Sequence, residues 1–136
     1  MPRPRSENPT PGELEVLQII WQHGACTVRQ VLQELNKSRE RAYTSVMSLL
    51  NVMVEKGLLQ REPEGKAFLY SAAVQEQPTL RRMVGDLVER VFRGSPRMLV
   101  AHALEQTDPS PRELDELQQL IDQYRARQQP AADEDQ

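Results

Sequence analysis

The sequence predicts a mostly α-helical protein, in which three helices and a β-hairpin are followed by a second segment made only of helices. Through most of the 136 residues, apolar side chains recur every three or four positions, as on one face of a helix. Between residues 58 and 71 this period gives way to two short strand candidates with a turn between them. Residues typical of helix ends bound each helical run, and they set the order of the elements.

The first two predicted helices each begin with a capping box, which is a Thr followed three positions later by Glu or Gln. Thr10–Glu13 opens the first helix, with Pro11 at its first position, and Thr27–Gln30 opens the second. Gly24 ends the first helix, because glycine readily takes the left-handed conformation found at helix ends.

The third predicted helix runs from about Arg39 to Lys56 and ends at Gly57. Residues 58–62 and 66–71 are the strand candidates, and Pro63-Glu64-Gly65 between them is typical of a turn. The first half of the chain therefore has the order helix, helix, helix, hairpin.

The second half of the chain has a purely helical pattern. An apolar stripe runs from Leu80 to Val91, and two further helices are expected to begin at Pro96 and Pro111, each of which follows a serine. Residues 128–136 are Gln, Pro, Ala and acidic residues, a composition that predicts a disordered tail.

Charge also divides the chain. The formal net charge is -3, but residues 1–74 carry nine Lys or Arg against eight Asp or Glu, whereas residues 75–136 carry eight against twelve. Together with the change of pattern after the hairpin, this predicts two domains, residues 1–74 and residues 75–136. Only the first has a charge balance that suits nucleic acid.

Several classes of protein are excluded or disfavoured by composition. The single cysteine, Cys26, excludes an internal disulfide, and no apolar run approaches the roughly 20 residues that span a membrane. The N-terminus lacks the apolar stretch of a signal peptide. We therefore expect a cytoplasmic protein without membrane insertion.

Three helices followed by a hairpin is the layout of a winged helix-turn-helix, in which the third helix enters the major groove of DNA. The apolar face of the third helix is needed for the core, so its other face is free to carry hydroxyl and guanidinium groups toward phosphates and base edges. The candidate DNA-binding residues on and before this face are Arg39, Arg41, Tyr43, Thr44, Ser45 and Ser48. Arg61 and Lys66 flank the hairpin turn and are the candidates in the wing.

The segment Arg41–Asn51, followed by Glu55–Leu59, closely resembles the penicillinase and methicillin-resistance repressor family of the BlaI/MecI type. Leu14–Trp21, Thr27–Val31 and the wing segment Gly65–Ser71 are also similar to that family. The likeness extends from about residue 11 to residue 120.

This resemblance implies a homodimer that binds a palindromic DNA operator and represses antibiotic-resistance genes. It implies base contacts from Thr44 and Ser45, supported by Tyr43 and Arg41. It also places the dimer interface in the C-terminal helices, where the apolar residues expected at the interface are Leu80, Met83, Val84, Leu87, Val88, Val91, Leu99, Leu117, Leu120, Ile121 and Tyr124.

In well-studied members, a membrane sensor metalloprotease pathway leads to cleavage of the repressor at an Asn-Phe bond. The matching pair here is His102-Ala103, which departs from that pattern. Release by a ligand or by oxidation of Cys26 is therefore an alternative, and so is a winged-helix module that binds only protein.

No pattern typical of an enzyme is present. The sequence contains no phosphate-binding glycine loop and no nucleophile motif, and its two histidines lack the spacing of metal ligands. We expect no catalytic activity, no cofactor and no bound metal.

Overall fold

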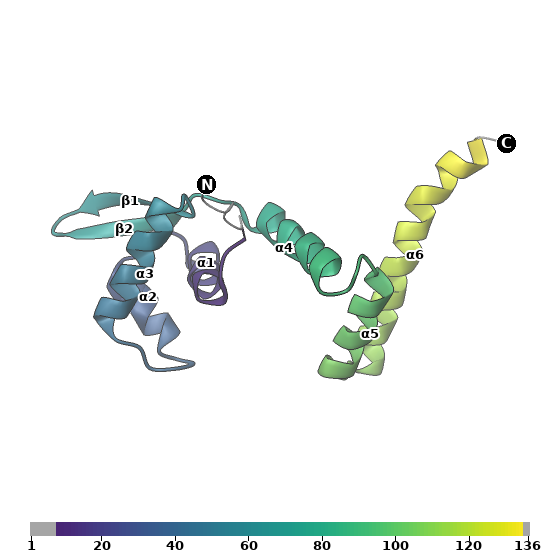
Figure 1. Cartoon of the computed structure of the whole chain (residues 1–136), viewed down its shortest axis with the longest axis horizontal. Coiled ribbons are helices and arrows are strands. Elements are labelled where there is room, and N and C mark those ends of the chain that lie inside the picture. Colours follow the sequence, from purple (N-terminus) through teal and green to yellow (C-terminus); the bar gives the residue numbers. More distant parts are fainter. Residues whose placement is uncertain (1–7, 135–136) are drawn as a thin grey trace. The chain divides into compact units, whose positions relative to one another are not determined.

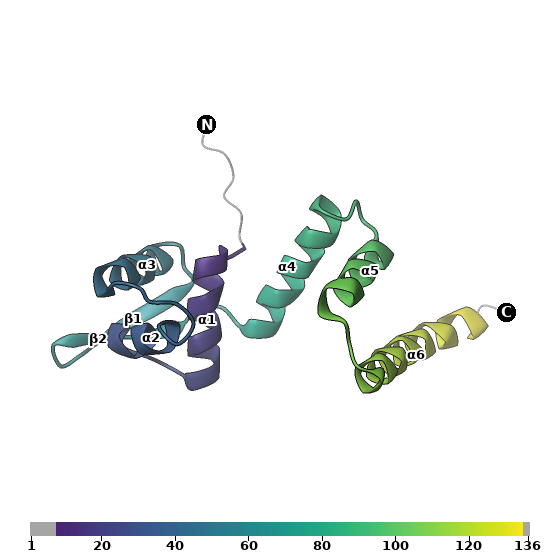
Figure 2. The same ribbon diagram turned by 90° about the horizontal axis from the view of Figure 1, so that it is seen from below.

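The computed structural model describes the backbone of residues 8–134 and the side chains of residues 8–128. It confirms the mostly helical fold class, with three helices and a β-hairpin wing followed by further helices (Figures 1 and 2). The elements are α1 (Pro11–His23), α2 (Val28–Leu35), α3 (Tyr43–Glu55), β1 (Leu59–Glu64), β2 (Ala67–Ala72), α4 (Glu76–Arg90), α5 (Pro96–Thr107) and α6 (Pro111–Glu134).

Capping side chains define the ends of α1 and α2. The hydroxyl of Thr10 accepts the Glu13 amide at 3.2 Å, and the Glu13 carboxylate accepts the Thr10 amide at 2.9 Å. Thr27 and Gln30 make the same reciprocal pair at the start of α2. Gly24 follows α1 with a φ of 84°, a conformation that side chains other than glycine rarely adopt. Both predicted capping boxes are confirmed.

The start of α3 was predicted wrongly. The helix begins at Tyr43 rather than near Arg39, and Ala42 before it is extended, with a ψ of 146°. The side chain of Asn36 accepts the backbone N–H of Arg41 at 2.8 Å, which holds the segment before α3 as a loop. Arg39 and Arg41 therefore lie in the loop between α2 and α3.

The hairpin differs from expectation by a shift of its turn. β1 and β2 are antiparallel, with Glu64 opposite Ala67, so only Gly65 and Lys66 form the turn. Pro63 belongs to β1, and a proline fits there because β1 has β2 as its single strand partner among the described residues, so its outer side needs no N–H donor. Gly65 has a φ of 62°, as a tight hairpin turn requires.

The core lies among α1, α2, α3 and the base of the wing. Its fully buried members include Leu17, Val31, Leu50 and Met53, one or more from each helix, and Tyr70 from β2. Cys26, in the loop between α1 and α2, pairs with β2 at a single residue. Its amide donates to the carbonyl of Tyr70 at 2.9 Å, and its carbonyl accepts the Tyr70 amide at 2.7 Å. This packing fixes the wing beside α3.

The chain divides into two compact units, with the boundary between Leu87 and Val88, inside α4. The sequence instead places the boundary before α4, after residue 74. Within the second unit, no described side chain from residue 88 to residue 128 is buried. None of the helices among the described residues is long and apolar enough to cross a membrane.

The last helix is longer than the periodicity predicts. Its backbone is helical as far as Glu134, so the part of the predicted disordered tail from residue 128 to residue 134 is helical. Residues 135 and 136 lie outside the described residues.

One buried ion pair connects α1 to the end of α3. The Glu13 side chain is only 3% exposed, and its carboxylate lies 2.7 Å from Nζ of Lys56. Burial alone raises the pKa of Glu13, but hydrogen bonds from Lys56 and Thr10 and the charge of Lys56 outweigh it. They hold the pKa below the ordinary value of 4.5.

We expect Glu13→Gln to lower the free energy of unfolding at pH 7 by roughly 1–3 kcal/mol, because a buried charge-assisted pair is lost. The lowered pKa means that the carboxylate stabilises the fold above its ordinary pKa, and that this contribution disappears as the pH falls through the lower, folded-state value. Urea unfolding at pH 7 and at about pH 3 should therefore show a difference from wild type that shrinks in acid. Glu55→Gln, at an exposed position on α3, is the control, and an equal effect of both variants would contradict the assignment.

Candidate nucleic-acid interface

The outward face of α3 carries the hydroxyl groups that the sequence singles out. Thr44, Ser45 and Ser48 are exposed, while Val46 and Leu50 on the opposite face are buried in the core. Ala42 provides no side-chain cap for the first turn of α3. The exposed face therefore begins with backbone amides that can donate to an anion and continues with three hydroxyl groups.

Tyr43 at the start of α3 is exposed and has a cationic neighbour, Arg29, that was not among the predicted site residues. The guanidinium of Arg29, on α2, lies 5.8 Å from the centre of the Tyr43 ring. Arg29 is exposed, and this contact brings a positive charge next to the hydroxyl face. In the sequence, Arg29 stands out only by its position between Thr27 and Gln30 of a capping box. Its contact with Tyr43 is formed by the packing of α2 against α3 and cannot be predicted from spacing.

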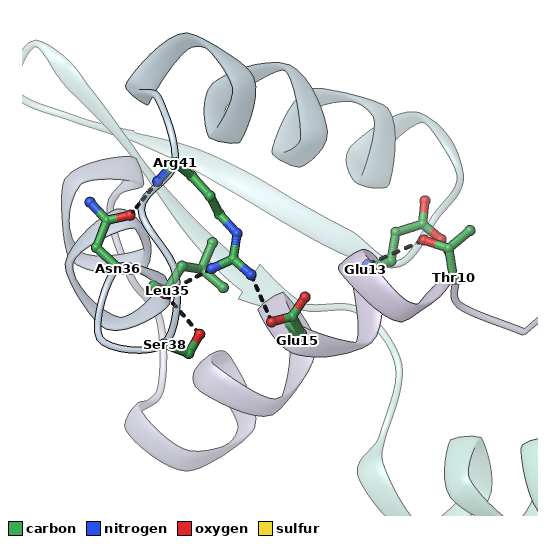
Figure 3. A network of polar contacts seen from close by, with 7 residues as sticks. All are labelled: Thr10, Glu13, Glu15, Leu35, Asn36, Ser38 and Arg41. Carbon is green, nitrogen blue, oxygen red and sulfur yellow. Dashed lines mark hydrogen bonds and ion pairs between the residues drawn. The ribbon is translucent and has the colours of Figure 1, made fainter.

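Arg41 lies differently from the expectation. Its guanidinium turns inward from the loop and pairs with Glu15 on α1 at 2.9 Å, while it also donates to the carbonyl of Leu35 at 2.8 Å (Figure 3). The side chain is only 14% exposed. Arg39, two residues earlier in the same loop, is exposed. The structure thus brings Tyr43, Thr44, Ser45 and Ser48 to one face and gives Arg41 contacts within the protein.

The wing is tied to α3 by a polar contact. Arg61 on β1 donates to Oδ1 of Asn51 at 2.9 Å, and the hydroxyl of Tyr70 lies 3.3 Å from the same oxygen. The Arg61 guanidinium also stacks over the ring of Phe68, 4.6 Å from its centre. Asn51 was not among the predicted site residues, because only the fold places it against the hairpin. Lys66 is exposed in the hairpin turn.

The sequence model of the penicillinase repressor family matches residues 9–123. The chain belongs to this family. It is 27% identical to the penicillinase repressor of Bacillus licheniformis, over 85% of this chain and 90% of that protein. It is 25% identical to the methicillin resistance regulatory protein MecI of Mammaliicoccus sciuri, over 80% of this chain and 89% of that protein.

Among solved structures, the chain is similar to monomeric Bacillus licheniformis BlaI in complex with the blaP half-operator. The two are 28% identical, with a TM-score of 0.42, over 55% of this chain and 85% of that one. Family membership makes the chain a DNA-binding transcriptional repressor and not an enzyme, in agreement with the sequence.

The environment of Cys26 in the repressor does not favour a reactive thiol. The side chain is buried, and Sγ donates to the carbonyl oxygen of Gly24 at 3.2 Å. Burial raises the pKa of the Cys26 thiol, and the negative charge of Glu34 raises it further. Because the thiolate is the form that reacts with oxidants, this site disfavours regulation by thiol oxidation. Among the described residues, no group of three His, Cys, Asp or Glu side chains could hold a metal ion.

His102-Ala103, the possible cleavage bond predicted from the resemblance, lies within α5 of the repressor. His102 and Ala103 are both exposed, and the His102 ring packs against Phe92, with the ring centres 5.5 Å apart. The bond is thus at the surface but inside a helix.

The apolar residues predicted for the dimer interface are largely uncovered in the single repressor chain. Those that are exposed are Val84, Leu87, Val91, Leu117, Leu120, Ile121 and Tyr124. Those that are half-buried are Leu80, Met83, Val88 and Leu99.

Proposed function

We propose that the repressor is a homodimer that binds a palindromic operator by placing α3 of each subunit in a major groove. The observation that carries this proposal is the exposed hydroxyl face of α3, with Thr44 and Ser45 beside an uncapped helix start, in a chain of the penicillinase repressor family. Hydroxyl groups donate to and accept from base edges, and the helix amides suit phosphate. The proposed repressor acts in the cytoplasm, where its target DNA lies.

The second unit supports the homodimer. Its helices bury none of the described side chains from residue 88 to residue 128, yet α6 exposes Leu114, Leu117, Leu120 and Ile121. Helices in proteins gain most of their stability from packing an apolar face, so these exposed residues of α6 need a partner surface. A second copy of the same unit supplies a matching surface by two-fold symmetry, and this symmetry also fits a palindrome.

Release of the repressor is proposed to follow a membrane sensor metalloprotease pathway, as the family resemblance suggests. A cut in α5 at His102-Ala103 would separate the DNA-binding helices from α6 and so weaken the dimer. Because a protease needs an extended segment, this bond must first leave the helix. The buried thiol of Cys26 makes oxidation the weaker alternative.

The wing offers a direct test of DNA binding. We expect affinity for duplex DNA to fall steeply with salt, because cationic side chains displace counterions from phosphate. Lys66→Ala should reduce the slope of log Kd against log salt concentration by about one, since one phosphate contact is lost. Fluorescence anisotropy with a labelled duplex measures both quantities.

Lys37→Ala is the matched control for the wing variant. Lys37 also carries a positive charge at the surface, but it pairs with Glu34 at 2.7 Å, and its removal should change the slope less. Binding that does not depend on salt would instead favour a winged-helix module that binds only protein. An unchanged slope in Lys66→Ala alone would remove the wing turn from the DNA contacts.

A further inference from the structure

The loop between α2 and α3 is held by one arginine. Three groups of Arg41 are bonded within the protein: the backbone N–H to Asn36, one guanidinium nitrogen to the carbonyl of Leu35, and the other to Glu15. Figure 3 shows the side chain crossing from the loop to α1, with the carboxylate of Glu15 at its far end. Arg41 therefore links α1, the end of α2 and the residue just before α3.

The end of α2 is a favourable place for this guanidinium. Leu35 is the last residue of α2, and its carbonyl oxygen also accepts the hydroxyl of Ser38 at 3.1 Å. Carbonyls at a helix C-terminus carry partial negative charge, which attracts a cation. The Glu15 carboxylate then neutralises the positive charge from the other side, in a site where Arg41 is mostly shielded from water.

The position of this link bears on the start of α3. Arg41 is separated from Tyr43, the first residue of α3, by Ala42 alone. No side chain caps α3 at Ala42, so the direction in which the helix begins depends on the loop before it. Arg41 and Glu15 also line an open pocket of about 330 Å³ together with Ala42 and Ser45. The polar contacts of Arg41 hold the loop at the edge of this pocket.

We propose that Glu15 and Arg41 form a clamp that positions α3 for DNA, so that Glu15 on α1 is a positioning residue for operator binding. This inference rests on the proposed function and deepens it. It also assigns Arg41 to the clamp rather than to the DNA contacts that the sequence predicts. The two assignments differ in a measurable way, because a clamp needs Glu15, whereas an arginine that binds phosphate is hindered by a neighbouring carboxylate.

The test compares Glu15→Ala, Glu15→Gln, Arg41→Ala and Glu40→Ala in the full-length protein. Glu15 is 42% exposed, so its removal should leave the fold intact. Gln keeps an oxygen that can accept from Arg41, and Glu40 is an exposed carboxylate in the same loop, so Glu40→Ala controls for the loss of one negative charge. The probes are a duplex selected by the wild-type protein from a random-sequence pool and a duplex of random sequence.

We expect Glu15→Ala to weaken binding to the selected duplex by about tenfold, the scale of one charge-assisted hydrogen bond. Binding to random DNA and the salt slope should stay unchanged, because no phosphate contact is lost. Glu15→Gln should restore most of the affinity, and Glu40→Ala should not weaken binding. Unchanged or tighter binding by Glu15→Ala, or a salt slope lower by about one in Arg41→Ala, would overturn the clamp.

Hydrogen exchange without DNA separates this inference from the proposed function. The amides of residues 41–46 should exchange faster in Glu15→Ala than in Glu40→Ala, because the loop and the first turn of α3 lose their attachment. If the wild-type protein bound no DNA, the proposed function would fail, and faster exchange would still support the clamp. Equal exchange in the two variants would overturn it.

Discussion

Replacing Leu120 and Tyr124 by aspartate is expected to make the repressor a monomer and to weaken its binding to a palindromic duplex by about 100-fold or more. The two side chains lie one turn apart on α6 and are 62% and 55% exposed in the single chain. A carboxylate at an apolar interface would lose its hydration without a partner, so the dimer should dissociate. A single subunit would then bind one half-site and lose the affinity gained when two linked subunits bind both half-sites.

The matched control is the double variant Gln119→Asp and Gln123→Asp. It adds the same two charges, also one turn apart on α6, but at polar positions. Sedimentation equilibrium and DNA binding should both resemble the wild type. If the Leu120 and Tyr124 variant remains a dimer, or if the control dissociates equally, the apolar face of α6 is not the interface.

Thr44→Ala is expected to weaken binding to the selected palindrome by roughly 1–3 kcal/mol, the usual cost of losing a good base contact. Thr44 is exposed, so the substitution should leave the free energy of unfolding nearly unchanged and report on DNA alone. Binding to random-sequence DNA should change little, because base contacts carry the sequence information. Mobility-shift titrations with both duplexes measure the difference.

Thr44→Ser is the control for the hydroxyl group. It keeps the donor and acceptor and removes only a methyl group, so most of the affinity should remain. An equal loss of affinity for both duplexes in Thr44→Ala would show that this residue does not read base sequence.

The sequence predicts a helix end correctly where residues close in the chain determine it. The capping boxes at Thr10 and Thr27 form as predicted, because each needs only side chains three positions apart. The start of α3 was missed because the side chain of Asn36 captures the amide of Arg41, five residues further on. That competition between a helical and a looped conformation is decided by the packing of the loop and not by helical periodicity.

In the candidate site too, local features are predictable from the sequence and contacts between distant residues are not. The exposed hydroxyl face of α3 is predictable, since burial of Val46 and Leu50 turns Thr44 and Ser48 outward. Contacts between elements are not predictable from spacing. Arg41 meets Glu15, 26 residues away in the chain, and therefore turns away from the surface where the sequence places it.

Binding of a palindrome through α3 can be measured in two steps. The full-length protein first enriches duplexes from a random-sequence pool, and guanine methylation in the major groove then maps where binding is blocked. We expect an inverted repeat, with two sites of interference separated by a whole number of helical turns, because a two-fold axis would relate the two copies of α3. Thr44→Ala should remove the preference at the positions that α3 reads. Enrichment of a single half-site or a direct repeat, or no enrichment at all, would show that the repressor does not bind DNA as a symmetric dimer through α3.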